Sequence, residues 1–281
     1  MTRRRDDDAV ITAPDRCTQY RASSIAPATP RIRHLLGVWA HPDDEAYLSA
    51  ALMARTIEDG GRVTLVTLSD GEAGFPVDDV RPPADRARLR RRELRAAMAR
   101  IGVTDIRFVG LSDGRVAEQG GDPLVETIKK LMIDLEPDVT VTFGPDGMTG
   151  HADHIHNSWA VTSAWANTGI GDLWYAGKSQ AWLDEWRRMH ENFGIWMTGE
   201  PPATSRTDAV LTIALDEREL DQKRAVLAEH ASQTSAVADA FGENDYRRWI
   251  AEETFRRPSV IELIEATAQT RRRDVTLADV A

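Results

Sequence analysis

The sequence predicts an α/β fold, namely a doubly wound, mostly parallel Rossmann-like sheet with helices on both faces. From residue 34 onward, short runs rich in Val, Ile and Leu alternate with segments of helical spacing. The helical segments are about ten residues or longer, as crossovers between parallel strands must be. With 281 residues, 42% of them hydrophobic and 28% charged, the chain can bury one large core or two modest ones, so wholesale disorder is excluded.

The first half of the chain carries the clearest alternation. Apolar runs such as LLGVWA at 35–40 are typical of strands that are buried on both faces. Gly60 and Gly61 end the first predicted helix. The predicted strands are 35–40, 62–68, 106–109 and 139–143, and the predicted helices between them are 45–58, 85–101 and 123–135.

After residue 143 the alternation loosens. Residues 153–165 are predicted to be helical, 210–215 a returning strand and 216–230 a strongly amphipathic helix. Six of the eight tryptophans lie between Trp159 and Trp196, whereas a uniform core would scatter them. We interpret 159–200 as a Trp-rich lid inserted into the fold, and the residues around 246–250 and beyond as helical and peripheral.

Residues 1–30 show no apolar period and are predicted to be a flexible N-terminal tail. Residues 31–281 are expected to form a single α/β domain, because no linker divides them. No apolar run is long enough to cross a bilayer, and the Arg-rich start lacks the apolar region of an export signal. We therefore expect a soluble protein of the bacterial cytoplasm without stable membrane insertion.

Charge and cysteine content narrow the possible partners. The net charge of −10 argues against a nucleic-acid partner, because phosphates attract clusters of Lys and Arg. The single cysteine, Cys17, excludes a disulfide framework within the chain and a metal site built from thiolates. Any metal site must therefore use His, Asp and Glu.

Polar clusters follow each of the predicted strands in the first half of the chain. In a parallel sheet the carboxyl ends of the strands meet at one edge, which is where ligands bind. The four loops are therefore expected to converge on one site. They contain HPDDE at 41–45, SDGEAG at 69–74, SDG at 112–114 and HADHIH at 151–156.

The loop that follows the first strand has an ordinary structural explanation, because Pro and acidic residues suit the start of a helix. That explanation does not cover His41. Two imidazoles and a carboxylate that leave a fourth position for water form the typical donor set of a catalytic zinc site. We therefore predict that His41, Asp44 and His154 bind one zinc ion per chain, although other divalent metals remain possible.

Neighbouring residues suit the hydrolytic chemistry of such a metal. Asp43 points differently from Asp44 and can act as general base toward a metal-bound water. His151 lies one turn from His154, where it can protonate a leaving amine or stabilise an oxyanion. Asp153 can orient a histidine through a hydrogen bond to its second nitrogen.

These motifs resemble the LmbE-like (PIG-L) family of zinc-dependent N-deacetylases. The opening signature AHPDDE is matched at 40–45, and the second signature, H-x-D-H, at 151–154. Weaker family features are the TLSDGEAG loop at 67–74, Arg90 with Glu93, and HASQ at 230–233. The resemblance covers roughly residues 34–235.

The resemblance implies hydrolysis of an N-acyl group, typically the acetyl group of an N-acetylglucosamine unit, to a free amine. It implies the same metal ligands as above, with Asp43 as general base and His151, paired with Asp153, as acid or oxyanion stabiliser. Arg90 and Asp113 lie where family members contact the sugar. A small-molecule glycoside is therefore the expected partner.

The substrate depends on the Trp-rich segment. Trp182 and Trp186 are four residues apart, and such a stripe packs in a core more often than it binds a ligand. Tryptophan also stacks on sugar and aromatic faces. On that basis Trp159 and Trp182 are predicted substrate contacts, and the expected substrate is a glycopeptide antibiotic of the teicoplanin kind. The alternative is an N-acetylglucosaminyl-inositol deacetylase or a mycothiol-conjugate amidase of the mycothiol pathway.

Two other classes of protein are disfavoured. A sugar-binding protein with a degenerate site would lack some catalytic residues, but every proposed one is present. A nucleotide-binding or receiver domain would use acidic groups for magnesium, whereas histidines in both metal loops favour zinc. The chain also has no G-x-G-x-x-G after its first strand and no G-x-x-x-x-G-K.

Overall fold

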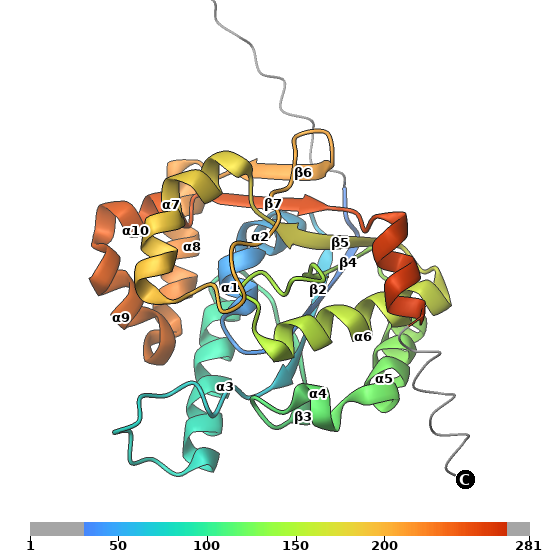
Figure 1. The fold of residues 1–281 in the computed structure, drawn as a ribbon, viewed down its shortest axis with the longest axis horizontal. Helices are drawn as coiled ribbons and strands as arrows, with labels where there is room; N and C mark the ends of the chain where they lie inside the picture. Colours follow the sequence, from blue (N-terminus) through green and yellow to red (C-terminus); the bar gives the residue numbers. More distant parts are fainter. Residues whose placement is uncertain (1–30, 269–281) are drawn as a thin grey trace, which may run out of the picture.

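A computed structural model describes residues 31–268, which are built around one seven-stranded sheet (Figure 1). The strand order is β3-β2-β1-β4-β5-β7-β6, and the first five of these strands pair in parallel. β7 runs antiparallel to both of its neighbours. The strands are β1 (His34–Trp39), β2 (Arg62–Ser69), β3 (Asp105–Leu111), β4 (Val139–Phe143), β5 (Asp172–Gly177), β6 (Ala209–Ala214) and β7 (Glu252–Arg256). The predicted tail, 1–30, lies outside the described residues.

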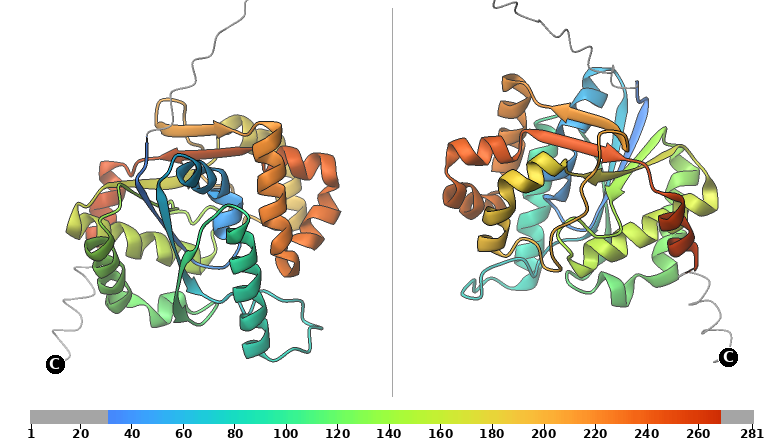
Figure 2. Two further views of the ribbon diagram at one scale, coloured as in Figure 1. Left: turned by 180° about the vertical axis from the view of Figure 1, so that it is seen from behind. Right: turned by 45° about the horizontal axis from the view of Figure 1, so that its top comes forward.

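Helices cover both faces of the sheet, as predicted (Figures 1 and 2). Successive residues of β1 point to opposite faces, so Leu35 packs in one hydrophobic cluster with α2, α3 and α8, while Leu36 packs in the other with α5 and α6. The helices are α1 (Asp44–Leu48), α2 (Ala50–Glu58), α3 (Pro83–Ala99), α4 (Val116–Gln119), α5 (Gly121–Leu135), α6 (Ala152–Thr168), α7 (Gln180–Phe193), α8 (Glu217–Glu229), α9 (Ala231–Phe241) and α10 (Glu243–Trp249).

The helix predicted over 45–58 is broken into α1 and α2. Ser49 leaves the helical conformation with φ −147° and ψ 11°, and its hydroxyl donates to the carbonyl of Glu45. The break lets α1 present Asp44 and Glu45 to the site while α2 packs along the sheet.

The Trp-rich segment is largely part of the fold instead of an insertion. It contains the end of α6, all of β5 and α7, and neither β5 nor β7 was predicted from the sequence. Trp159, Trp174 and Trp186 are at most 5% exposed and pack in the two hydrophobic clusters. Clustering of tryptophans along the chain therefore reflects core packing more than a lid.

Among the described residues, no helix has both the length and the apolar composition that a membrane span requires.

A buried ion pair ties four elements together: α8, β7, α1 and α2. The ammonium of Lys223 in α8 lies 2.7 Å from a carboxylate oxygen of Glu253 in β7 and donates to the carbonyl of Tyr47. The same carboxylate accepts from the backbone nitrogens of Ala51 and Leu52 at the start of α2. Both side chains are almost completely buried, so neither charge has water as an alternative partner.

Replacing Lys223 with methionine should lower the free energy of unfolding by about 3–5 kcal/mol, because the charge of Glu253 would stay buried without its partner. Denaturant unfolding measures this. Lys130→Met is the matched control, since Lys130 is largely exposed and should leave the midpoint unchanged. Equal midpoints for the two variants would show that the ion pair does not stabilise the fold.

Candidate active site

A cavity of about 530 Å³ opens at the carboxyl ends of the parallel strands. His41 and Asp44 reach it after β1, Ala73 and Gly74 after β2, and Asp113 after β3. The fourth loop, between β4 and α6, contributes Met148, Thr149 and His151, and His154 follows in the first turn of α6. The four loops expected from the sequence therefore meet at one site.

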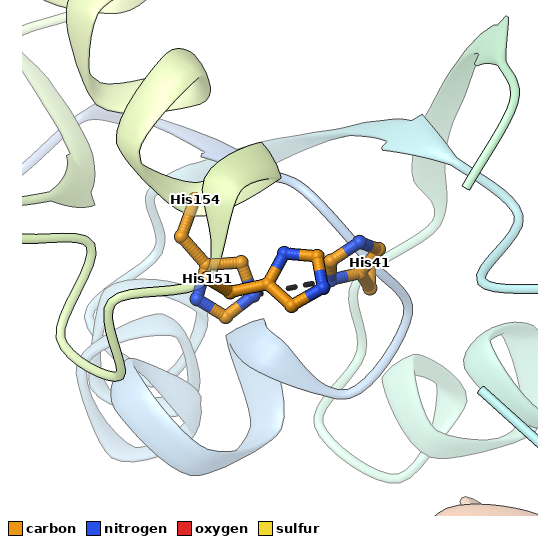
Figure 3. A group of neighbouring side chains, drawn as sticks. All are labelled: His41, His151 and His154. Carbon is orange, nitrogen blue, oxygen red and sulfur yellow. Dashed lines mark hydrogen bonds between the residues drawn. The ribbon is translucent and has the colours of Figure 1, made fainter. Parts of the chain in front are cut away.

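Two histidines face each other across this site (Figure 3). Nδ1 of His41 and Nε2 of His154 lie 3.1 Å apart. The Asp44 carboxylate closes the third side, with one oxygen 3.4 Å from Nε2 of His154 and the other 3.7 Å from Nδ1 of His41. Donor atoms at about 2.0–2.1 Å from a tetrahedral metal are separated by about 3.3 Å, so the two nitrogens and the Asp44 carboxylate could hold one metal ion.

The outer nitrogens of both rings are held by acceptors. Nδ1–H of His154 donates to the carbonyl of Gly147 at 3.0 Å. Nε2–H of His41 faces a carboxylate oxygen of Asp113 at 3.0 Å and one of Asp153 at 3.3 Å. With those nitrogens protonated, the two facing nitrogens can share one further proton in a hydrogen bond or direct their lone pairs to one bound cation. Metal-binding histidines are oriented in this way.

The charges around His41 are strongly coupled. Burial opposes protonation of this ring, but the hydrogen bonds to Asp113 and Asp153 outweigh it and raise the pKa of His41 to about 10. Burial also raises the pKa of Asp44 to about 6, against the attraction of His41. Burial and the charge of His41 lower the pKa of His154. His41 is thus the ring that carries a positive charge, while His154 stays neutral.

Asp43 is held in an unusual backbone conformation beside the metal ligands. Its φ is +116°, which L residues rarely adopt, and Glu45 accepts a hydrogen bond from its backbone nitrogen. The other oxygen of Glu45 pairs with Nε2 of His230 at 2.9 Å. Burial raises the pKa of the Asp43 carboxyl to about 6, although Arg90, 3.1 Å away, opposes the shift. This carboxyl group can therefore exchange a proton near neutral pH.

His151 has a fixed tautomer. Its Nδ1 accepts from the backbone nitrogen of Asp153 at 3.1 Å, so the neutral ring carries its proton on Nε2. Burial and the charge of His41 lower the pKa of His151 and favour that neutral form. The three histidine rings lie about 5 Å apart, close enough for a nitrogen of His151 to join His41 and His154 around one metal (Figure 3).

Several predicted site residues contact different partners than expected. The Asp153 carboxylate orients His41 instead of His151, and it also accepts from the backbone of Gly114 and Val116. Asp113 lies against the same His41 ring. Arg90 donates to the carbonyls of Gly71 and Pro42 besides pairing with Asp43. Asp113 and Arg90 thus hold site residues in place, and both also line the cavity, where their contact with a sugar stays a prediction.

The two tryptophans predicted to contact the substrate lie in different places. Trp182 lines the cavity. Trp159 is 5% exposed, packs with Leu36 and Val161 in the hydrophobic cluster on the other face of the sheet, and does not line the cavity. His156, the last residue of the motif at 151–156, is also buried, with its ring 4.7 Å from that of Trp159.

One end of the cavity was not predicted from the sequence apart from Trp182. We call it the aromatic end. Lys178 directly follows β5, His190 lies in α7, and Trp249 ends α10, so only the fold brings them together. No motif marks these positions in the sequence. The aromatic end consists of Lys178, Trp182, His190, Trp196 and Trp249.

Comparison with known proteins gives a consistent result. The PIG-L family model, described as GlcNAc-PI de-N-acetylase, matches residues 36–165. Two relatives are named 1D-myo-inositol 2-acetamido-2-deoxy-alpha-D-glucopyranoside deacetylase. The one from Streptomyces griseus is 42% identical over 150 residues, which are 44% of this chain and 45% of that protein. The one from Acidothermus cellulolyticus is 34% identical over 253 residues, covering 75% of this chain and 82% of that protein.

A solved structure shares the fold. A deacetylase of the teicoplanin biosynthesis pathway superposes with a TM-score of 0.60, covering 81% of this chain and 99% of that one. The two sequences are only 14% identical, so this likeness concerns the fold alone.

Proposed function

The chain belongs to the PIG-L (LmbE-like) family of N-deacetylases, and we propose that it removes the acetyl group from an N-acetylglucosamine unit linked to inositol. The enzyme class follows from the family: a hydrolase of N-acetyl amides. The inositol-linked substrate is favoured over a glycopeptide antibiotic because the relatives at 34–42% identity carry that name. The teicoplanin-pathway enzyme is similar in fold only.

The metal site rests on one observation, the two imidazole nitrogens that face each other at 3.1 Å while acceptors hold their outer nitrogens. We propose zinc at this position, bound by Nδ1 of His41, Nε2 of His154 and the Asp44 carboxylate. When bound, zinc supplies a polarised carbonyl and a water of lowered pKa. The donor set contains no thiolate, in agreement with the single cysteine of the chain.

The residues around the metal would move the protons of amide hydrolysis. Asp43, with its pKa raised to about 6, would accept the proton of the attacking water and pass it toward the leaving nitrogen. Arg90 would keep the Asp43 carboxylate in place. Nε2–H of His151 would donate a hydrogen bond to the oxygen of the acetyl group as negative charge builds on it. Asp153 and Asp113 would hold His41 in its metal-binding orientation.

The aromatic cover over the substrate is smaller than the lid expected from the sequence. We propose that Trp182 and Trp196, which both line the cavity, cover the glycoside, and we leave Trp159 out of the substrate contacts.

Strands from both halves of the chain join one sheet, which supports the proposal that residues 31–281 act as one deacetylase domain. The cytoplasmic location stays a prediction.

Incubating the zinc-loaded protein with N-acetylglucosaminyl-inositol should release acetate and replace the acetyl group of the glycoside by a hydrogen, with the corresponding loss of mass. An N-acylated glycopeptide antibiotic should react much more slowly under the same conditions. Mass spectrometry of both reactions makes the comparison. Faster deacylation of the glycopeptide would overturn the substrate assignment, and no reaction with either compound would overturn the proposed function.

A further inference from the structure

Lys178 is a buried ammonium group in the wall of the cavity. The residue is 6% exposed, donates to the carbonyl of Glu252 at 2.8 Å, and lies 4.7 Å above the ring of Trp182. The other three lysines of the chain each form an ion pair with a carboxylate: Lys129 with Glu126, Lys130 with Asp134, and Lys223 with Glu253. Among the described residues, no carboxylate lies within ion-pair distance of Lys178.

The nearest carboxylates are engaged elsewhere. The oxygens of Glu252 accept from the backbone nitrogen and hydroxyl of Ser179 and from the hydroxyl of Thr254. Glu253 is occupied by Lys223 and the start of α2. Burial and the charge of Lys223 lower the pKa of Lys178 to about 7, although the charges of Glu252 and Glu253 oppose the shift. A lysine has three N–H donors, and one carbonyl satisfies only one of them.

A second donor on the same wall also lacks a partner. Nε2 of His190 accepts from the indole nitrogen of Trp249 at 3.0 Å, so the neutral ring carries its proton on Nδ1. His190 is 1% exposed, and its Nδ1 has no hydrogen-bond partner in the described part of the chain. The rings of His190 and Trp182 lie 5.0 Å apart, so His190 and Lys178 both contact the indole of Trp182.

Buried donors of this kind are costly unless an acceptor meets them, and a buried charge costs more than a neutral donor. We propose that the aromatic end of the cavity is a subsite for an anionic group of the glycoside substrate, a carboxylate or a phosphate, held by Nζ of Lys178 and Nδ1–H of His190. The indoles of Trp182 and Trp249 would pack against the planar or apolar part that carries the anion. The indole nitrogens of both are already satisfied by protein acceptors, Trp182 by the carbonyl of Trp249 and Trp249 by His190.

This subsite rests on the proposed function and extends it: N-acetylglucosaminyl-inositol itself is uncharged, so the anionic group would belong to a further substituent on the aglycone. The test uses three aryl N-acetylglucosaminides whose ring carries a hydrogen, a carboxylate or a phosphate. For the zinc-loaded enzyme, kcat/KM should be at least about 10-fold higher with an anionic ring than with the uncharged one, the size expected of a charge-assisted hydrogen bond. The carboxylate and phosphate arms show which anion the site prefers.

Lys178→Met should abolish the preference, and Lys178→Arg should keep part of it. Lys130→Met, which removes an exposed lysine, should keep all of it. Equal kcat/KM values for charged and uncharged rings, or a preference that survives Lys178→Met, would overturn the subsite. If no glycoside is deacetylated, the proposed function fails instead, and calorimetric binding of the carboxylate and uncharged compounds to wild type and Lys178→Met still decides the subsite.

Discussion

Replacing Asp43 with asparagine should leave zinc bound and slow deacetylation by about 10²–10⁴-fold, the usual contribution of a general base. The amide cannot accept the proton of the attacking water. Asparagine suits the position, because it tolerates positive φ better than most residues and Asp43 has φ +116°. The hydrogen bond from the backbone nitrogen to Glu45 does not depend on the side chain.

Zinc content and turnover must be measured on the same Asp43→Asn preparation. Zinc at the wild-type level with a large loss of kcat would fit a proton-transfer role. Wild-type turnover would contradict the general-base assignment. Loss of zinc would instead make Asp43 part of the metal site.

His154→Ala should abolish both zinc binding and activity. The ring supplies one of three proposed ligands, and its orientation depends on the Gly147 carbonyl and on stacking against Phe143 at 4.2 Å. Losing an outer partner of a ligand costs about 10–100-fold in metal affinity, and losing the ligand itself should cost more.

His156→Ala is the matched control for His154→Ala, because it removes a buried histidine from the same helix that does not line the cavity. This variant should keep one zinc per chain, measured by elemental analysis after dialysis. Full zinc content in His154→Ala would rule His154 out as a ligand.

The sequence predicted the first half of the fold well because its strands are continuous apolar runs between long helices. β7 escaped prediction because Glu252 and Glu253 make it look polar, yet Glu253 is buried by its pairing with Lys223 in α8. β5 lies inside the Trp-rich segment, where aromatic clustering suggested a lid. Both strands acquire their burial only from distant parts of the chain.

The candidate site likewise contains residues that the sequence identified and residues that only the fold brings together. Residues in contiguous motifs, such as His41 and His154, could be singled out because several chemistry-bearing side chains stand close in sequence. The residues that hold these side chains in place could not be identified from the sequence. Asp113 and Arg90 were predicted as sugar contacts, and only the fold shows that they also lie against His41 and Asp43. Within the aromatic end the sequence indicated only Trp182, because Lys178 and Trp249 come to lie 4.7 and 6.3 Å from the Trp182 ring only after β5, α7 and α10 have packed.

X-ray diffraction at the zinc absorption edge tests the proposed metal ligands, His41, Asp44 and His154, most directly. Crystals of the zinc-loaded protein should show one anomalous peak per chain, within about 2.0–2.2 Å of Nδ1 of His41, Nε2 of His154 and an oxygen of Asp44. A peak bound by His151 in place of Asp44, or a peak away from the His41–His154 pair, would contradict the assignment.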